Sequence, residues 1–209
     1  MEKTTRLRRP ARPAFGSPPY NGAVPPIPPR VLLGLTTALW VLACWRAGPP
    51  WGDFANYYTA ADIWWTFGRD SEELTRLYDF RFFNDHTARV GFGDRLSGFP
   101  ILTPPSALLA APLLFLSAAG AGKAWWVLQG IMGWLTGVVT ARSLGRPAWA
   151  GVAALAVIWP ALRGHFSQGQ FHLPAVLCLA LGFAAWQAKR PLLTGLTWGL
   201  AIGLKVHAW

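Results

Sequence analysis

The chain has 209 residues, of which 53% are hydrophobic and only 13% charged, and its formal net charge is +10. Soluble domains carry about 25% charged residues, so this composition argues against a soluble core and predicts an integral membrane protein. In such a chain, excess Lys and Arg indicates cytoplasmic flanks and anionic lipid headgroups. No base-stacking module or basic helix supports a nucleic-acid partner.

The N-terminal region divides into a polar tail and a first apolar run. Residues 1–30 carry six Lys and Arg and many prolines, so we expect a disordered tail in the cytoplasm. Residues 31–45 are apolar, and a helix that continues through Arg46 is long enough to span a membrane. A cleaved signal peptide is the alternative. Bulky Leu42 and the later apolar runs argue against it.

Residues 46–98 form the polar segment of the chain. Eight of the nine Asp and Glu residues lie there, and none follows Asp94. The stretch from Asn56 to Phe67 is typical of a helix, and the many Phe, Tyr and Trp residues predict packing on the membrane surface. Any carboxylate used for chemistry must therefore come from this segment, where Asp53 is nearest the predicted membrane edge.

Residues 99–117 are apolar but interrupted by four prolines. The uninterrupted part suits an interfacial or re-entrant helix better than a span, since a span needs about 17 to 25 residues. Pro104 and Pro105 fit the start of such a helix. We therefore expect residues 46–123 to form one extracytoplasmic loop within an integral membrane domain, residues 31–209.

Four stronger apolar runs follow, at residues 124–141, 148–162, 171–188 and 191–204. Arg142 and Arg146 follow the first run, and Lys189 and Arg190 follow the third, so the positive-inside rule places both pairs in the cytoplasm. The separator at residues 163–170 is a longer polar loop. It then shares the outer face with residues 46–123 and Lys205.

This topology predicts an all-α, multi-pass protein of the plasma membrane with a cytoplasmic N-terminus. It requires that the helix at residues 104–117 does not cross the bilayer. If that helix crosses, Arg142 and Arg146 lie outside instead.

Several chemistries have no support in the sequence. The four histidines are scattered, and neither CxxC nor HExxH occurs, so we expect no metal. No Gly-rich phosphate loop and no Gly-x-Ser-x-Gly elbow is present, and we expect no cofactor. Cys44 and Cys178 lie inside apolar runs and indicate no disulfide framework.

The remaining candidate is Asp53 with polar companions. A carboxylate at a membrane edge can act as a general base for an acceptor hydroxyl. Arg163, His165 and Lys205 could supply positive charge to a phosphate leaving group, which suits glycosyl transfer from a lipid phosphate. The alternative is that Asp53 only caps the following helix.

The other candidates also have structural alternatives. Tyr57 and Tyr58 could stack on a sugar or pack in a core. Gln168 and Gln170 could contact substrate or form interfacial hydrogen bonds. His172 could bind substrate, although a satisfied polar residue at a helix start is commoner. Tryptophans at three further positions suggest an interfacial belt: Trp125, Trp126 and Trp149.

Five motifs occur in an order that resembles glycosyltransferase family 87, the polyprenol-phosphate-mannose-dependent mannosyltransferases of the C-type (GT-C) superfamily. They are GDFANYYTAADIWW from Gly52, LYD from Leu77, FPILTPPSALLAAPLLFL from Phe99, GQFH from Gly169 and GLTWGLAIGLK from Gly195. The chain departs from the family pattern at three positions: Thr103 stands for Tyr, His172 for Asn and Ala208 for Pro.

The resemblance implies a GT-C fold, of which this chain is the N-terminal part of the transmembrane bundle, truncated at the C-terminus. It implies a catalytic Asp in the first extracytoplasmic loop, which Asp53 matches. It also implies a metal-independent, inverting transfer of a sugar, mannose above all, from a polyprenyl-phosphate donor to a lipid or glycan acceptor. A non-catalytic membrane protein or inactive fragment that binds lipid or a partner is the alternative.

Overall fold

The computed structural model describes residues 27–50, 52–68, 72–93 and 104–204, and all the regular elements in these ranges are helices. The all-α prediction is therefore confirmed for this part of the chain. The longer helices are α1 (Pro29–Ala47), α2 (Asp53–Phe67), α4 (Phe80–Thr87), α5 (Pro104–Ala110), α6 (Ala118–Ser143), α7 (Ala148–Val157), α8 (Trp159–Gln168), α9 (His172–Gln187) and α10 (Pro191–Leu204). The shorter ones are α3 (Glu72–Thr75), η1 (Arg76–Tyr78), η2 (Ala88–Phe92) and η3 (Ala111–Leu113).

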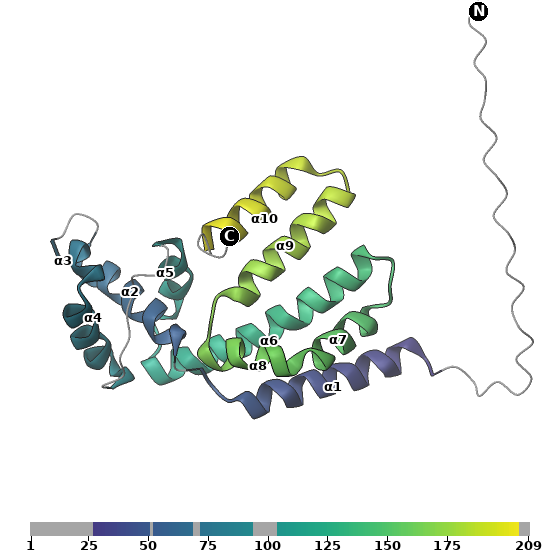
Figure 1. Ribbon diagram of the computed structural model, residues 1–209, viewed down its shortest axis with the longest axis horizontal. Coiled ribbons are helices and arrows are strands. Elements are labelled where there is room, and N and C mark those ends of the chain that lie inside the picture. Colours follow the sequence, from purple (N-terminus) through teal and green to yellow (C-terminus); the bar gives the residue numbers. More distant parts are fainter. Residues whose placement is uncertain (1–26, 51, 69–71, 94–103, 205–209) are drawn as a thin grey trace, which may run out of the picture.

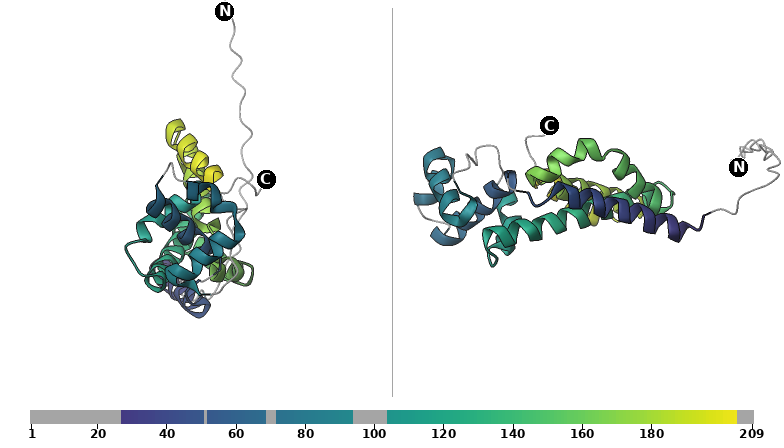
Figure 2. Two further views of the ribbon diagram at one scale, coloured as in Figure 1. Left: turned by 90° about the vertical axis from the view of Figure 1, so that its left-hand side faces the viewer. Right: turned by 90° about the horizontal axis from the view of Figure 1, so that it is seen from below.

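The helices form a bundle with a lobe at one end. Helices α1, α6 and α7 lie side by side, and the α9–α10 hairpin packs on α6 (Figure 1). Helices α2 to α5 gather at one end of this bundle, which gives the molecule its elongated shape (Figure 2). The predicted extracytoplasmic loop is thus a folded helical lobe.

Helix α1 has the clearest features of a membrane span. Its 19 residues are long and apolar enough to cross a bilayer. Pro29 occupies its first turn, where no N–H bond is lost. The segments Ala107–Leu113 and Ala118–Ser143 pass the same test only together, and they are bent by 114°. Because α7, α9 and α10 have only 10 to 16 residues, the multi-pass character stays a prediction.

Helices α6 and α7 approach each other closely at two glycines. A Cβ atom at Gly151 would overlap the Gly137 carbonyl oxygen, and one at Gly137 would lie 3.0 Å from the Gly151 backbone. Small residues let helix backbones meet in this way. The neighbouring Val152 is fully buried in the resulting contact.

The structure corrects the predicted polar loop at residues 163–170. The apolar run 148–162 is broken at Ile158, and α8 begins at Trp159 and continues to Gln168. Pro160 explains the break, because proline lacks the N–H that would continue α7 but fits the first turn of a new helix. Gly169, with φ of 72°, ends α8 in the left-handed conformation.

The glycine contact between α6 and α7 generates a stability prediction. We expect Gly151→Ala to destabilise the protein by about 1–3 kcal/mol, the usual cost of overpacking. Gly164→Ala is the matched control, because nothing lies within 4 Å of a Cβ at this helical position. Thermal unfolding in detergent would compare the two variants. Equal melting temperatures of the two variants would show that the stability of the protein does not depend on the close contact of α6 with α7 at Gly151.

Candidate functional site

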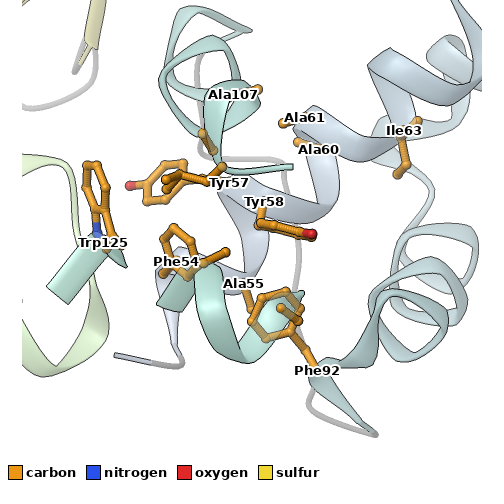
Figure 3. Close-up of a cluster of buried hydrophobic side chains, with 14 of the residues drawn as sticks. Phe54, Ala55, Tyr57, Tyr58, Ala60, Ala61, Ile63, Phe92, Ala107 and Trp125 are labelled. Atoms are coloured by element: carbon orange, nitrogen blue, oxygen red, sulfur yellow. The ribbon is translucent and has the colours of Figure 1, made fainter. Parts of the chain in front are cut away.

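The lobe is built around the buried face of α2. Phe54, Tyr57 and Tyr58 are buried there, and Trp125 of α6 lies against Phe54 (Figure 3). The Phe54 and Trp125 rings stack with centroids 5.8 Å apart. The Tyr57 ring stacks on Phe171 at 3.8 Å. These aromatic contacts fix α2 against α6 and the start of α9.

Two side chains of α6 hold the turn between α8 and α9. Trp125 Nε1–H donates to the Gly169 carbonyl oxygen at 2.9 Å, and Gln129 Nε2–H donates to the Phe166 carbonyl oxygen at 3.4 Å. Both residues are buried. For Trp125 this corrects the interfacial-belt prediction, because its ring and its N–H both serve the interior. The position of the turn therefore depends on α6.

Asp53 lies beside this same turn. A Cβ at Gly52 would overlap Gln168 Oε1, and a Cβ at Gly169 would lie 2.6 Å from Phe54 Cβ. The two chain neighbours of Asp53 thus contact the two residues at the end of α8. The first and fourth of the five motifs, far apart in sequence, meet here.

Asp53 is the first residue of α2, and Gly52 occupies the N-cap position. The capping alternative is therefore wrong for this residue, although a negative charge in the first turn still favours the helix dipole. Asp53 is half-buried. No hydrogen bond or ion pair joins it to another residue of the described ranges.

Three predicted site residues come together at the α8–α9 turn. His165 Nδ1–H donates to Gln170 Oε1, which leaves His165 Nε2 for a ligand. The His165 and His172 rings have centroids 4.4 Å apart. Arg163 lies on the same helix and is exposed, whereas Lys205 lies outside the described residues.

The structure places Tyr57 and Tyr58 in the core, as in the packing alternative. Tyr57 is covered by Phe171, and the Tyr58 hydroxyl donates to the Leu116 carbonyl oxygen at 2.9 Å. Burial raises the pKa of Tyr57, the Asp53 charge raises it further, and a hydrogen bond from the Phe171 backbone acts in the opposite direction. Tyr57 therefore stays a neutral phenol near Asp53.

Two other carboxylates of the lobe have structural roles. Asp79, of the LYD motif, accepts from the Arg81 and Phe82 backbone N–H groups and caps α4. The Phe82 hydrogen bond is the main reason why the pKa of Asp79 is lowered. Asp62 pairs with the buried His86 at 2.8 Å, which ties α2 to α4. In the ranges that the structure describes, no group of three His, Cys, Asp or Glu could hold a metal.

Sequence reasoning missed the residues that position the turn. Trp125 and Gln129 are one helical turn apart on α6, so they share a face. The sequence did contain one indication, because Gln129 is a polar residue inside an apolar run. A glutamine that is buried in such a helix needs hydrogen-bond partners. Phe171 carried no signal of its role, since its stacking on Tyr57 depends on tertiary structure.

The anchoring of the turn can be tested by Trp125→Phe. We expect faster amide hydrogen exchange over residues 165–172, because the Gly169 carbonyl loses its donor at a cost of about 1–3 kcal/mol. Trp126→Phe is the matched control, since Trp126 Nε1–H donates to Cys44 of α1 instead. Equal exchange of this segment in both variants would contradict the role of Trp125.

The sequence pattern of glycosyltransferase family 87 matches residues 101–208. This segment contains α6 to α10 and the His165, Gln170 and His172 cluster, while Asp53 lies before it. Comparison with curated proteins and with solved structures found no match. Since the matched segment covers just over half of the 209 residues, the chain belongs to glycosyltransferase family 87.

Proposed function

We propose that this protein transfers a sugar, mannose, from a polyprenyl-phosphate donor to a lipid or glycan acceptor on the extracytoplasmic side of the membrane. Family membership makes it a glycosyltransferase with sugar donor and acceptor substrates. Donor, acceptor and side are our proposal. The observation that supports it best is the contact of Gly52 and Phe54 with Gln168 and Gly169. This contact puts residue Asp53 beside a turn that carries basic and polar side chains.

In the proposed reaction Asp53 is the general base. It takes the proton of the acceptor hydroxyl while the hydroxyl oxygen forms a bond to C1 of the sugar. The bond between C1 and the donor phosphate oxygen breaks, and polyprenyl phosphate leaves with the electron pair. Attack opposite to the leaving group inverts the configuration at C1. No other group of the chain needs to form a covalent bond.

The charge that develops on the phosphate requires positive partners. Arg163 carries a guanidinium group, which can form two parallel hydrogen bonds to a phosphate. His165 Nε2 and the Gln170 amide lie at the α8–α9 turn, where the donor phosphate would reach them. His172, whose ring lies beside that of His165 at an interplanar angle of 51°, would limit the movement of the His165 ring. We include Lys205 in this group on its sequence position alone.

Tyr57 would position the base in this proposal. Its ring is fixed on Phe171, one turn after Asp53 on α2. It therefore holds the first turn of α2 against the α8–α9 turn. Tyr58 holds α2 against the segment before α6, because its hydroxyl donates a hydrogen bond to the Leu116 carbonyl oxygen.

Replacement of the base tests the proposed function. We expect Asp53→Asn to lower the transfer rate by about a hundredfold or more, the usual scale for loss of a general base. Asp62→Asn is the matched control, because that carboxylate lies on the same helix but pairs with His86. Transfer from polyprenyl-phosphate mannose would be measured in membranes. Unchanged transfer by Asp53→Asn would exclude Asp53 as the base.

The proposed topology can be tested with single cysteines in a background that lacks Cys44 and Cys178. We expect a membrane-impermeant thiol reagent to label Ser97→Cys and Ser167→Cys on intact cells, but not Ser143→Cys or Arg190→Cys. The reason is that short loops rich in Lys and Arg resist translocation. Labelling of Ser143→Cys without Ser167→Cys would place the α8–α9 turn in the cytoplasm and overturn the proposed side.

A further inference from the structure

The α6–α7 and α9–α10 turns have the same backbone structure. In each turn a residue with a positive φ is followed by an arginine and a proline: Gly145-Arg146-Pro147 and Lys189-Arg190-Pro191. In each turn the arginine N–H donates to the carbonyl oxygen five residues earlier, at 2.8 Å in the first and 2.9 Å in the second. This is the Schellman motif that commonly ends a helix. The two turns therefore hold their arginines at equivalent backbone positions.

Both turns lie at the end of the bundle away from the lobe (Figure 1). They carry four cationic side chains, all exposed, which we call the basic end: Arg142, Arg146, Lys189 and Arg190. Among the described residues, no carboxylate lies within ion-pair distance of any of them. The sequence has no Asp or Glu after Asp94, so helices α6 to α10 cannot supply one. An anion at the basic end would therefore meet no competing carboxylate of these helices.

The turns do not need these cations for their structure. The α8–α9 turn, beside the lobe, has the same backbone hydrogen bonds and carries Gln170 after its left-handed Gly169. Lys189 has a φ of 56° and is the one non-glycine residue with a positive φ in the described ranges. Glycine adopts this conformation without strain and lysine does not. Strain at one residue indicates a role for its side chain.

An exposed apolar face begins at each turn. On α10, Leu192, Leu196 and Leu200 are exposed and four residues apart, so they share one face. This face begins two residues after Arg190. Trp186, in the last turn of α9, is also exposed, as is common for tryptophan at a membrane interface.

Helix α6 repeats this arrangement. Val127, Ile131 and Leu135 are exposed at the same four-residue spacing, and Arg142 follows Leu135 by seven residues on that face. An exposed apolar face thus leads to a cation on both helices. A phospholipid has the matching order, with acyl chains that lead to a phosphate.

Both faces also border apolar grooves. Val127 and Ile131 line a groove of about 330 Å³ between α1 and α6. Leu196 and Leu200 line a groove of about 650 Å³ beside α10. No charged residue lines either groove. The grooves give acyl chains an apolar surface to cover, which an acidic protein segment would not use.

We propose that the basic end binds the phosphate groups of an anionic phospholipid, phosphatidylglycerol, whose acyl chains follow the exposed faces of α6 and α10. Guanidinium groups suit phosphates through parallel, charge-assisted hydrogen bonds. Anionic lipids attract Lys and Arg near a membrane surface. The inference goes beyond the proposed function and does not depend on it, because the basic end lies away from the lobe that contains Asp53.

The test replaces the equivalent arginine of both turns. Phosphatidylglycerol would be titrated into the purified protein in detergent, and bound lipid followed by native mass spectrometry. We expect Arg146→Gln/Arg190→Gln to weaken binding by about tenfold, as loss of a charge-assisted phosphate contact predicts. The matched control is Arg46→Gln/Arg81→Gln, which removes two exposed arginines outside the basic end. It should bind within twofold of the unmodified protein, and melting temperatures would show that both variants are folded.

Lys189→Gly separates the side chain from the backbone. We expect this variant to melt at a higher temperature without lipid, because glycine relieves the strained φ. We also expect it to bind phosphatidylglycerol more weakly, because it lacks the charge. Lys189→Arg should keep the affinity. A purely structural Lys189 would change the melting temperature and leave lipid binding as it was, which would contradict its part in the proposal.

Three outcomes would overturn the proposal. Equal binding of phosphatidylcholine would show that the negative headgroup is not recognised. Displacement of phosphatidylglycerol by glycerol phosphate at equal concentration would show a site for free phosphate. Undiminished binding by Arg146→Gln/Arg190→Gln would show that the cations serve another anionic partner, such as an acidic protein segment. Asp53→Asn, which tests the proposed function, should bind phosphatidylglycerol normally, so the two proposals can fail separately.

Discussion

The hydrogen bond from Trp125 to the Gly169 carbonyl oxygen is the interaction on which the arrangement of the candidate site depends. Gly169 is left-handed, and its lack of a Cβ admits Pro50 and Phe54. If no donor reached this buried carbonyl, the free energy of unfolding would fall by about 1–3 kcal/mol. One indole therefore fixes the end of α8, the start of α9 and, through Phe54, the start of α2. Three segments far apart in sequence meet at one side chain of α6.

The sequence predicted those parts of the fold that depend on local pattern. The first apolar run was expected as a helix through Arg46, and α1 ends one residue later, at Ala47. The helical stretch from Asn56 to Phe67 corresponds to α2, which begins three residues earlier, at Asp53. Apolar composition and the absence of proline are sufficient for such predictions. Proline placed the start of α5 correctly for the same local reason.

The sequence could not predict what depends on tertiary contacts. The polar stretch from Arg163 to Gln168 is helical because it packs on α1 through Phe166, which contacts Trp40. Polar composition alone indicated a loop. Tyr57 and Tyr58 have the same chemistry whether they face a sugar or a core, so only the position of Phe171 and Leu116 decides between the two. From the sequence, the segments that contain Gly52 and Gln168 were expected only to face the same side of the membrane. A contact between these two residues was not predicted.

The distribution of carboxylate partners distinguishes Asp53 from Asp62 and Asp79, two other acids of the lobe. Asp62 is paired with His86, and Asp79 is used by the first turn of α4. Asp53 is half-buried and lies in the first turn of α2, where the helix dipole favours a negative charge. A partly desolvated carboxylate gains free energy from each hydrogen-bond donor that approaches it. An acceptor hydroxyl is such a donor, and its proton becomes easier to remove as the bond to the sugar forms. In the proposed reaction, the lack of a hydrogen-bond or ion-pair partner among the described residues leaves Asp53 available for the proton of the acceptor hydroxyl.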